Sequence, residues 1–286
     1  MPTFPAPAPI TTVLDQVAGS VHVVASDRDD VVVTVLPANP GKSADAHMAQ
    51  ETIVDFANGI LTVGNDRSLK NLVIGPKGAV AVTIELPTGS SLSGKIAFGA
   101  LDTEGALGAV DVTLSAGNAR VGAADRLTVN ASAGSIVAGR VAGPAELKAS
   151  AGSVRIREIA GDATIRSANG HTTVSVVTGS LTVSGAHGDI IVGRVAGSLV
   201  AKTSYGNVRV ENAESGSVRL TTSYGSVEVG VPEGTAALLD LQSKSGAIRN
   251  RLQPVAGPVG DESTAEIHAS TGYGDVIVRR PEPFIA

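Results

Sequence analysis

Short runs of alternating apolar and polar residues cover most of this chain. Within residues 134–225 the apolar side chains stand two and four positions after a glycine, as Val208 and Val210 do after Gly206. A period of two is that of a β-strand with one buried face, and runs of four or five residues are too short for helices. The pattern therefore predicts an all-β fold.

Glycine separates these runs at a fixed interval. It recurs every nine residues from Gly134 to Gly206, and after a slip of one residue it returns at Gly216 and Gly225. Segments that are two glycine intervals apart resemble each other more closely than segments that are one interval apart. Such a repeat is typical of stacked coils, with glycine at the corners because it tolerates a positive φ. We predict a single-chain β-solenoid with about 18 residues per coil.

Outside this repeat the pattern is less regular and predicts a different organisation. We expect a proline-rich tail (1–10), an amino-terminal β cap region (11–98), the solenoid repeats (99–280, with a loop insertion at about 252–263) and a second tail (281–286). In the cap, strands are predicted near 20–24, 31–35, 52–56, 59–63, 69–74 and 79–86, and residues 41–50 predict one helical turn. The first two strands form either a hairpin or two successive strands.

Composition refines this picture. The chain is 43% hydrophobic but only 2% aromatic, so Val, Ala, Ile and Leu supply the interior, which must be thin. Cysteine is absent, which excludes disulfides and thiolate metal sites. The net charge of -5 and the lack of basic runs argue against a nucleic-acid partner.

The amino end has neither the basic region nor the apolar core of a signal peptide, and no stretch approaches the length of a membrane-spanning helix. We therefore expect no integral membrane segment and a cytoplasmic location. A surface location would remain open if an export signal had been removed from the chain.

Three sequence features carry a family resemblance. They are Val17-Ala-Gly-Ser-Val-His-Val with Asp30-Val-Val-Val-Thr-Val, then Thr83-Ile-Glu-Leu-Pro-Thr-Gly, and then repeated Ser-x-Gly-x-Val-x-Val units. Over residues 11–280 the chain resembles the bacterial putative-adhesin domain family, a β-strand-repeat domain of unknown function. The resemblance implies a right-handed β-solenoid, and in some similar proteins the domain is linked to envelope stress responses or to binding at the cell surface. A weaker likeness is to bactofilin-type solenoids, which polymerise end to end.

The sequence offers little support for a metal, a cofactor or catalysis. Calcium-binding β-rolls use Gly-Gly-x-Gly-x-Asp turns, and the aspartates that directly follow a glycine here lack that doubled glycine: Asp162, Asp189 and Asp275. The five histidines are scattered without metal-ligand spacing. We find no cluster of acids, nucleophile elbow or phosphate-binding loop. We expect a protein that is not an enzyme and that has no cofactor.

Stacking of coils turns sequence spacing into columns of neighbours. One column consists of Arg155, Thr173, Ile191, Arg209, Glu228 and Arg249. It predicts a surface ion pair between Arg209 and Glu228 on adjacent coils. A second column contains Lys148, Arg166, Ser184, Lys202 and Thr221. Its three cations are a candidate binding stripe, although a solvated face is the expected explanation.

All three tyrosines occupy one motif position, before a corner glycine: Tyr205, Tyr224 and Tyr273. Tyr205 and Tyr224 should lie on neighbouring coils, close enough to stack. Such rings could form a platform for a sugar ring or an apolar side chain, or they could simply pack over the corner. They are the main candidate binding residues.

These observations favour a non-enzymatic, adhesin-like scaffold that binds a protein or a cell-envelope component through its laddered faces. The alternative is a self-assembling structural solenoid, similar to a bactofilin filament, in which open coil ends add like strands. Homo-oligomers are compatible with both hypotheses, but prolines at both ends of the chain weigh against filaments. A glycan-processing enzyme is a distant third hypothesis.

Overall fold

The computed structural model describes residues 1–64, 78–254, 257 and 262–281. Within these ranges all elements are β-strands except one helix, α1, so the predicted all-β fold class is confirmed. The strand predicted at 69–74 lies outside the described residues. The chain divides into two compact units, residues 1–148 and 149–286.

The first unit contains nine complete strands and the helix. They are β1 (Thr3–Pro5), β2 (Thr11–Ser26), β3 (Asp30–Pro37), α1 (Ser43–Glu51), β4 (Ile53–Ala57), β5 (Ile60–Gly64), β6 (Val80–Pro87), β7 (Ser91–Ala116), β8 (Ala119–Ala133) and β9 (Ile136–Val141). β10 (Ala145–Ala151) follows across the boundary.

β2 organises the first unit because it pairs along both edges. On one side it runs parallel to β7, and on the other its first half pairs with β5 and its second half with β6. β6 also pairs with β3, in the antiparallel sense. The strands predicted at 20–24 and 31–35 therefore do not form a hairpin with each other, because β6 lies between them.

Strand β1 forms within the segment that the sequence predicts to be a tail. Residues 3–5 pair antiparallel with β3, and the Val33 N–H donates to the Pro2 carbonyl at 3.1 Å. The tail prediction is therefore wrong for these residues. β1 lies at the edge of the sheet, where a strand needs hydrogen bonds on one side only and proline is tolerated.

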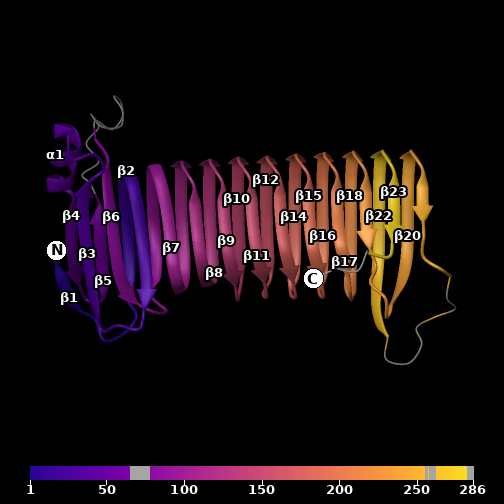
Figure 1. Ribbon diagram of the computed structural model, residues 1–286, viewed down its shortest axis with the longest axis horizontal. Coiled ribbons are helices and arrows are strands. Elements are labelled where there is room, and N and C mark those ends of the chain that lie inside the picture. The colour runs from indigo at the N-terminus through magenta and orange to yellow at the C-terminus, as the bar shows by residue number, and fades with distance from the viewer. Residues whose placement is uncertain (65–77, 255–256, 258–261, 282–286) are drawn as a thin grey trace. The chain divides into compact units, whose positions relative to one another are not determined.

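The helical turn predicted at 41–50 is confirmed, and α1 extends to Glu51. Its buried Asp45 accepts backbone N–H groups from Asn39 and Ala79, both at 3.0 Å. Asp45 therefore ties the start of the helix to the chain just before β6. Figure 1 shows α1 near β3 and β6 at the amino-terminal end of this unit.

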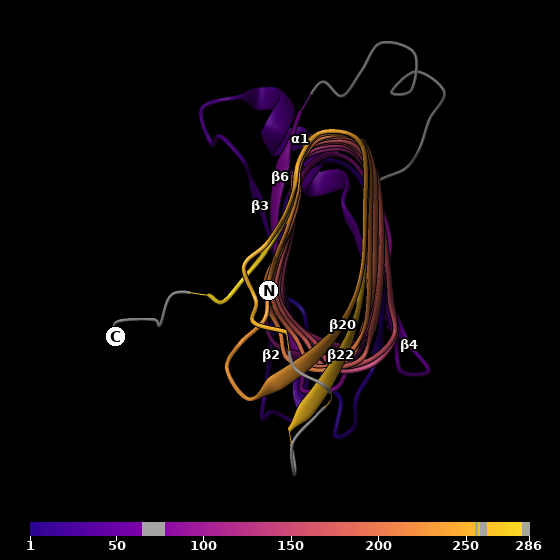
Figure 2. The same ribbon diagram turned by 90° about the vertical axis from the view of Figure 1, so that its right-hand side faces the viewer.

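The second unit is built from two series of parallel strands that alternate along the chain. One series is β11 (Val154–Ile159), β13 (Thr172–Val177), β15 (Ile190–Val195), β17 (Val208–Ala213), β19 (Val227–Gly230), β21 (Ile248–Asn250) and β23 (Val276–Arg279). The other is β12 (Ala163–Asn169), β14 (Ser180–His187), β16 (Ser198–Tyr205), β18 (Gly216–Tyr224), β20 (Thr235–Ser245) and β22 (Ser263–Tyr273). Figure 2 shows the successive coils of this unit almost superposed in projection.

The register confirms the predicted coil length. Val154 pairs with Thr172, Thr172 with Ile190 and Ile190 with Val208, so each step along the stack spans two glycine intervals of the sequence. Residues two and four positions after the corner glycines from Gly134 to Gly225 are buried between the two strand series, as Val208 and Val210 are. The interior is therefore the narrow aliphatic core that the composition predicts.

The coils approach so closely at their corners that a side chain has no room. Gly206 has φ +150°, and a Cβ added there would lie 2.2 Å from the Gly188 carbonyl oxygen of the preceding coil. At the opposite corner Gly197 has no positive φ, yet its Cβ would lie 2.1 Å from the Gly179 carbonyl oxygen. Glycine is thus required by both backbone conformation and close approach at Gly206, and by close approach alone at Gly197.

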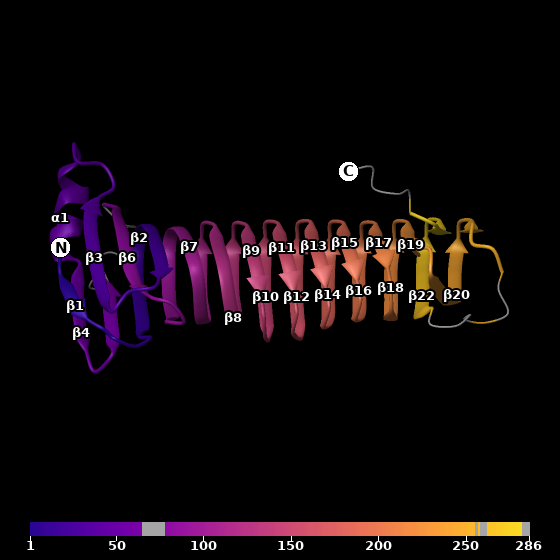
Figure 3. The same ribbon diagram turned by 60° about the horizontal axis from the view of Figure 1, so that its bottom comes forward.

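The last two coils of the second unit are not stacked in chain order. β22 pairs with β18 on one edge and β20 on the other, and β23 likewise lies between β19 and β21 (Figure 3). The predicted column that ends with Glu228 and Arg249 is therefore wrong at that step, because Ile277 separates them. The terminal coil in space is β20–β21, and β22 and β23, which come later in the chain, occupy the inner position.

Candidate functional site

Four aromatic side chains form a continuous stack on one corner of the second unit. We call this row the aromatic ladder: His187 on β14, Tyr205 on β16, Tyr224 on β18 and Tyr273 on β22. Neighbouring ring centroids are 5.1, 4.9 and 4.9 Å apart, and the planes are parallel to within 4°. The predicted stacking of Tyr205 and Tyr224 is confirmed.

The local sequence Thr-x-Tyr-Gly explains how each tyrosine is placed; x is Ser before Tyr205 and Tyr224 and Gly before Tyr273. In the motif of Tyr224 the buried Thr222 hydroxyl donates to the Gly206 carbonyl of the preceding coil at 2.8 Å. Tyr224, two residues later, points outwards, and Gly225 adopts φ +145° to turn the corner. Thr271 makes the equivalent bond to the Gly225 carbonyl at 2.8 Å. A row of buried hydroxyls thus fixes the corner from inside while the rings stack outside.

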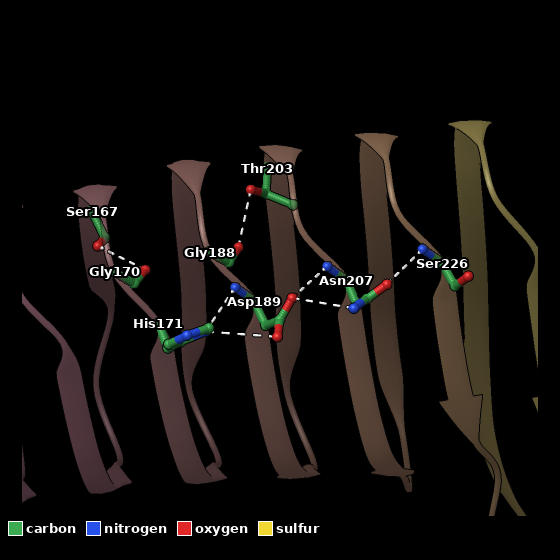
Figure 4. A network of polar contacts seen from close by, with 8 residues as sticks. All are labelled: Ser167, Gly170, His171, Gly188, Asp189, Thr203, Asn207 and Ser226. Atoms are coloured by element: carbon green, nitrogen blue, oxygen red, sulfur yellow. Dashed lines mark hydrogen bonds and ion pairs between the residues drawn. The ribbon is translucent and has the colours of Figure 1, made fainter.

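A second row of polar side chains starts directly after the corner glycines (Figure 4). His171 Nδ1 accepts the Asp189 N–H at 3.1 Å, Asp189 Oδ1 accepts the Asn207 N–H at 2.7 Å, and Asn207 Oδ1 accepts the Ser226 N–H at 2.9 Å. Each side chain therefore satisfies a backbone donor of the next coil. Asp189 directly follows a glycine, and here its carboxylate accepts a backbone N–H at the corner of the next coil.

Stacking determines which parts of the rings a ligand could reach. Tyr205 and Tyr224 lie between parallel neighbours, so they present mainly their edges and hydroxyl groups. Their exposed fractions are 51% and 47%, against 57% for Tyr273. Beyond Tyr273 the next residue in register is Ser245 on β20, which has no ring. Tyr273 therefore differs from the inner tyrosines in having an aromatic neighbour on one side only.

A hollow of about 880 Å³ lies beside this end of the ladder. Tyr224, Tyr273 and Ile248 contribute apolar surface to it, while hydroxyl, amide and ammonium groups come from neighbouring residues. These polar lining residues include Thr221, Gln242, Lys244 and Ser270. The hollow therefore combines aromatic surface with hydrogen-bonding groups, as small-molecule sites do.

The structure places the predicted basic residues in two different surroundings. In the second unit Arg166 and Lys202 share a column, with Ser184 between them, and Lys202 precedes Tyr205 on the same strand. Lys148 belongs to the first unit, where its Nζ lies 3.2 Å from Glu146 Oε1. Lys202 is thus the predicted cation that shares a strand with a ladder tyrosine.

His187 was missed by the sequence analysis as a member of the ladder. The spacing in the sequence could have identified it, because His187 stands two glycine intervals before Tyr205. In the structure the two residues pair in the β14–β16 register. The hollow could not be found in the same way, since β20 borders it only through the reversed order of the last two coils.

Charged groups gather on β19, β20, β22 and β23. Glu228 forms the predicted ion pair with Arg209, at 3.8 Å, and a closer ion pair with Arg279, at 2.6 Å. His268 lies between two carboxylates, with Nε2 2.9 Å from Glu266 Oε1 and Nδ1 3.1 Å from Asp240 Oδ2. These hydrogen bonds, first to Glu266 and then to Asp240, raise the pKa of His268, and the bond to His268 lowers the pKa of Asp240.

No group of three or more His, Asp or Glu side chains in the described ranges is placed to hold a metal ion. Within the same ranges, no helix has the length and apolar character needed to cross a membrane.

Comparisons with known proteins give a family but no activity. Residues 13–279 match the family model described as Toastrack DUF4097. A putative adhesin from Parabacteroides distasonis shares 14% identity with a TM-score of 0.42, covering 97% of this chain and 95% of that one. A putative adhesin from Bacteroides fragilis has 14% identity, a TM-score of 0.39 and the same coverage. No match was found among curated proteins.

Proposed function

This chain belongs to the Toastrack DUF4097 family, and we propose that it is a non-enzymatic, adhesin-like scaffold that binds a cell-envelope glycan at the Tyr273 end of its aromatic ladder. The observation that carries the proposal is the geometry of Tyr273. Tyr273 is 57% exposed, and its ring stacks on Tyr224 on one side and borders the 880 Å³ hollow.

The chemistry of the hollow suits a sugar ring better than a fully apolar ligand. An aromatic face offers apolar surface to the C–H groups of a pyranose, and the surrounding side chains offer hydrogen bonds to its hydroxyls. Thr221 and Ser270 are already 3.2 Å apart, Oγ1 to Oγ, and each retains capacity for a further hydrogen bond. Gln242 and Lys244 add an amide and an ammonium group to the lining.

The inner rings have a supporting role in this proposal. Because Tyr205 and Tyr224 are stacked on both sides, they hold Tyr273 in a fixed orientation and leave their edges for contacts with a longer chain of sugars. A preorganised ring loses little side-chain entropy on binding. Lys202, on the same strand as Tyr205, adds a cation for acidic sugars, and Arg166 extends that column.

The composition of the chain provides a direct assay. It has three tyrosines and no tryptophan, so all of its tyrosine emission comes from the ladder. We would titrate the protein with neutral, amino and acidic envelope oligosaccharides and follow this emission. We expect a saturable change with one class, and at least a tenfold loss of affinity in Tyr273→Ala, which corresponds to about 1.4 kcal/mol. Isothermal calorimetry gives the affinity of the variant independently of its fluorescence.

A matched control is available in the first unit. Phe98 is an exposed aromatic residue outside the ladder, and Phe98→Ala should leave glycan affinity unchanged. Failure of every oligosaccharide class to bind, or equal affinity of Tyr273→Ala and the parent protein, would overturn the glycan proposal. A protein ligand captured by the parent but not by the Tyr205→Ala/Tyr224→Ala variant would assign the ladder to a protein partner instead.

Location is a separate part of the proposal. The sequence predicts cytoplasm, whereas a glycan of the envelope requires exposure outside it. Fractionation of cells that make the full-length protein, with antibody detection in each fraction, distinguishes these locations. Detection in the cytoplasm alone would favour the protein partner over the glycan.

A further inference from the structure

The amino-terminal end of the first unit is closed. Its outer strands are β1 and β4, which are short, and β1 carries Pro5 at its end. Phe4 of β1 and Phe56 of β4 are in contact across this end, with ring centroids 5.2 Å apart. Short strands, proline and covering side chains are the usual means of protecting a sheet edge from pairing with another chain.

The terminal coil of the second unit, β20–β21, is open. β20 is an 11-residue strand, and among the described residues its only strand partner is β22, on one edge. Leu239 and Leu241 are in register with the fully buried Ile267 and Ala269, yet both are only partly buried. Outward-facing Leu238 is 70% exposed, and Ile248 of β21 is 48% exposed. An edge of this length with exposed leucines is a template for another strand.

We propose that β20 is a dimerisation surface, through which a second copy of this chain pairs end to end by an antiparallel β20–β20 contact. This goes beyond the proposed function and rests on the unpaired strand edge, but it shares Gln242 and Lys244 with the lining of the hollow. Leu239 and Leu241 of each copy, which are only partly buried, would then be covered by the β20 strand of the other copy.

The charge pattern of β20 is self-complementary. Asp240 and Lys244 are both exposed, and Gln242 lies midway between them. A two-fold, antiparallel pairing centred on Gln242 places Asp240 of each copy opposite Lys244 of the other. Opposite charges in directly facing cross-strand positions stabilise a pair, and like charges oppose it. A partner with an unrelated sequence would not be selected by this pattern, which is why we favour a second copy.

Closure at the amino end limits the assembly to two copies. An isologous contact uses the same surface on both subunits and leaves no equivalent surface free. A filament would instead need β20 to pair with the amino-terminal end of the next copy, where the Phe4–Phe56 contact and Pro5 oppose strand addition. The bactofilin-like filament considered from the sequence is therefore not the assembly that this geometry favours.

Sedimentation velocity of the full-length chain, without any glycan, tests the proposal. We expect a concentration-dependent species with twice the mass of the single chain. Lys244→Glu should weaken the dimer at least tenfold, because it places two acidic residues opposite each other. Asp240→Lys should do the same by placing two lysines in register, and the double variant Asp240→Lys/Lys244→Glu should restore the dimer.

Controls separate pairing from folding. Lys202→Glu reverses an exposed charge on β16, an inner strand, and should leave the dimer intact. Asp240 also contacts His268, so circular dichroism must show the parent β signal in each variant, and Lys244→Glu is the cleaner single change. A monomer at all concentrations, growth beyond the dimer, or no rescue in the double variant would overturn the proposal. Because no ligand is present, none of these outcomes depends on glycan binding.

Discussion

Tyr224 and Tyr273 are distant in the sequence, yet their rings are parallel to within 4° and their centroids are 4.9 Å apart. The contact exists because β22 inserts beside β18 and places Tyr273 in register with Tyr224. The chain thereby extends the aromatic ladder by one ring and leaves that ring beside a hollow. The return of the chain to this position is therefore the event that creates the candidate site.

The two ends of this contact should differ in their contribution to stability. Tyr224 stacks on two rings and Tyr273 on one. With about 0.5–1.5 kcal/mol for each aromatic pair, Tyr224→Ala should lose about twice the stacking energy that Tyr273→Ala loses. Urea unfolding followed by far-ultraviolet circular dichroism measures both. Equal destabilisation would show that stacking contributes little to the ladder.

A methyl group at a corner glycine should destabilise the second unit. In Gly206→Ala the Cβ meets the Gly188 carbonyl oxygen at 2.2 Å and the backbone must keep φ +150°. We expect a loss of at least about 2 kcal/mol, since left-handed strain alone costs about 1–3 kcal/mol. Gly41→Ala, where the nearest atom belongs to the Asn39 side chain, is the control and should be nearly neutral in thermal unfolding.

The buried hydroxyl row should also be measurable. Thr222→Val keeps the shape of the side chain but removes the 2.8 Å hydrogen bond to the Gly206 carbonyl. A buried acceptor that loses its partner costs about 1–3 kcal/mol. Thr182→Val, on the exposed side of β14, should change stability by less than about 0.5 kcal/mol. Similar values for the two variants would argue against a structural role for this row.

The attachment of β20 to β22 should depend on pH through His268. Its raised pKa means that the folded state favours the imidazolium, so its contribution is complete below the unfolded pKa of about 6.5 and is lost as pH rises through the higher folded value. The lowered pKa of Asp240 adds a contribution that is lost as pH falls through the folded Asp240 pKa.

Nuclear magnetic resonance titration of the His268 ring protons checks this expectation. Glu266→Gln should lower the pKa of His268 more than Asp240→Asn does, because the bond to Glu266 is the larger cause. Amide exchange in β20 should become faster above the His268 transition. Glu104→Gln, in the first unit, is the control and should leave the His268 titration unchanged.

The sequence predicted most of what repeats. The regular spacing of glycine predicted the parallel register, the slip near Gly216 and the stacking of Tyr205 on Tyr224, because identical spacing places identical positions above one another. It also predicted the Arg209–Glu228 pair. Each of these depends only on counting residues from one coil to the next.

What does not repeat could not be obtained by counting. A segment without periodicity separates β21 from β22, so counting residues could not predict the reversed order of β20 and β22. For this reason the neighbour of Glu228 was predicted to be Arg249, whereas it is Ile277. The pairing of β1 with β3 depends on long-range contacts that proline-rich sequence obscures. The hollow and the open edge of β20 both follow from the reversed order and were inaccessible for the same reason.

The reversed order also has a consequence for synthesis on the ribosome. Coils β11 to β19 can be laid down in the order in which they emerge, each on the one before. β20 emerges when its final neighbour, β22, has not yet been made, and the edge of β18 is the place available to it. In the last stage of folding, β22 must therefore pair with the edge of β18, which β20 is able to occupy first. A chain truncated before residue 263 should fold with β20 paired to β18.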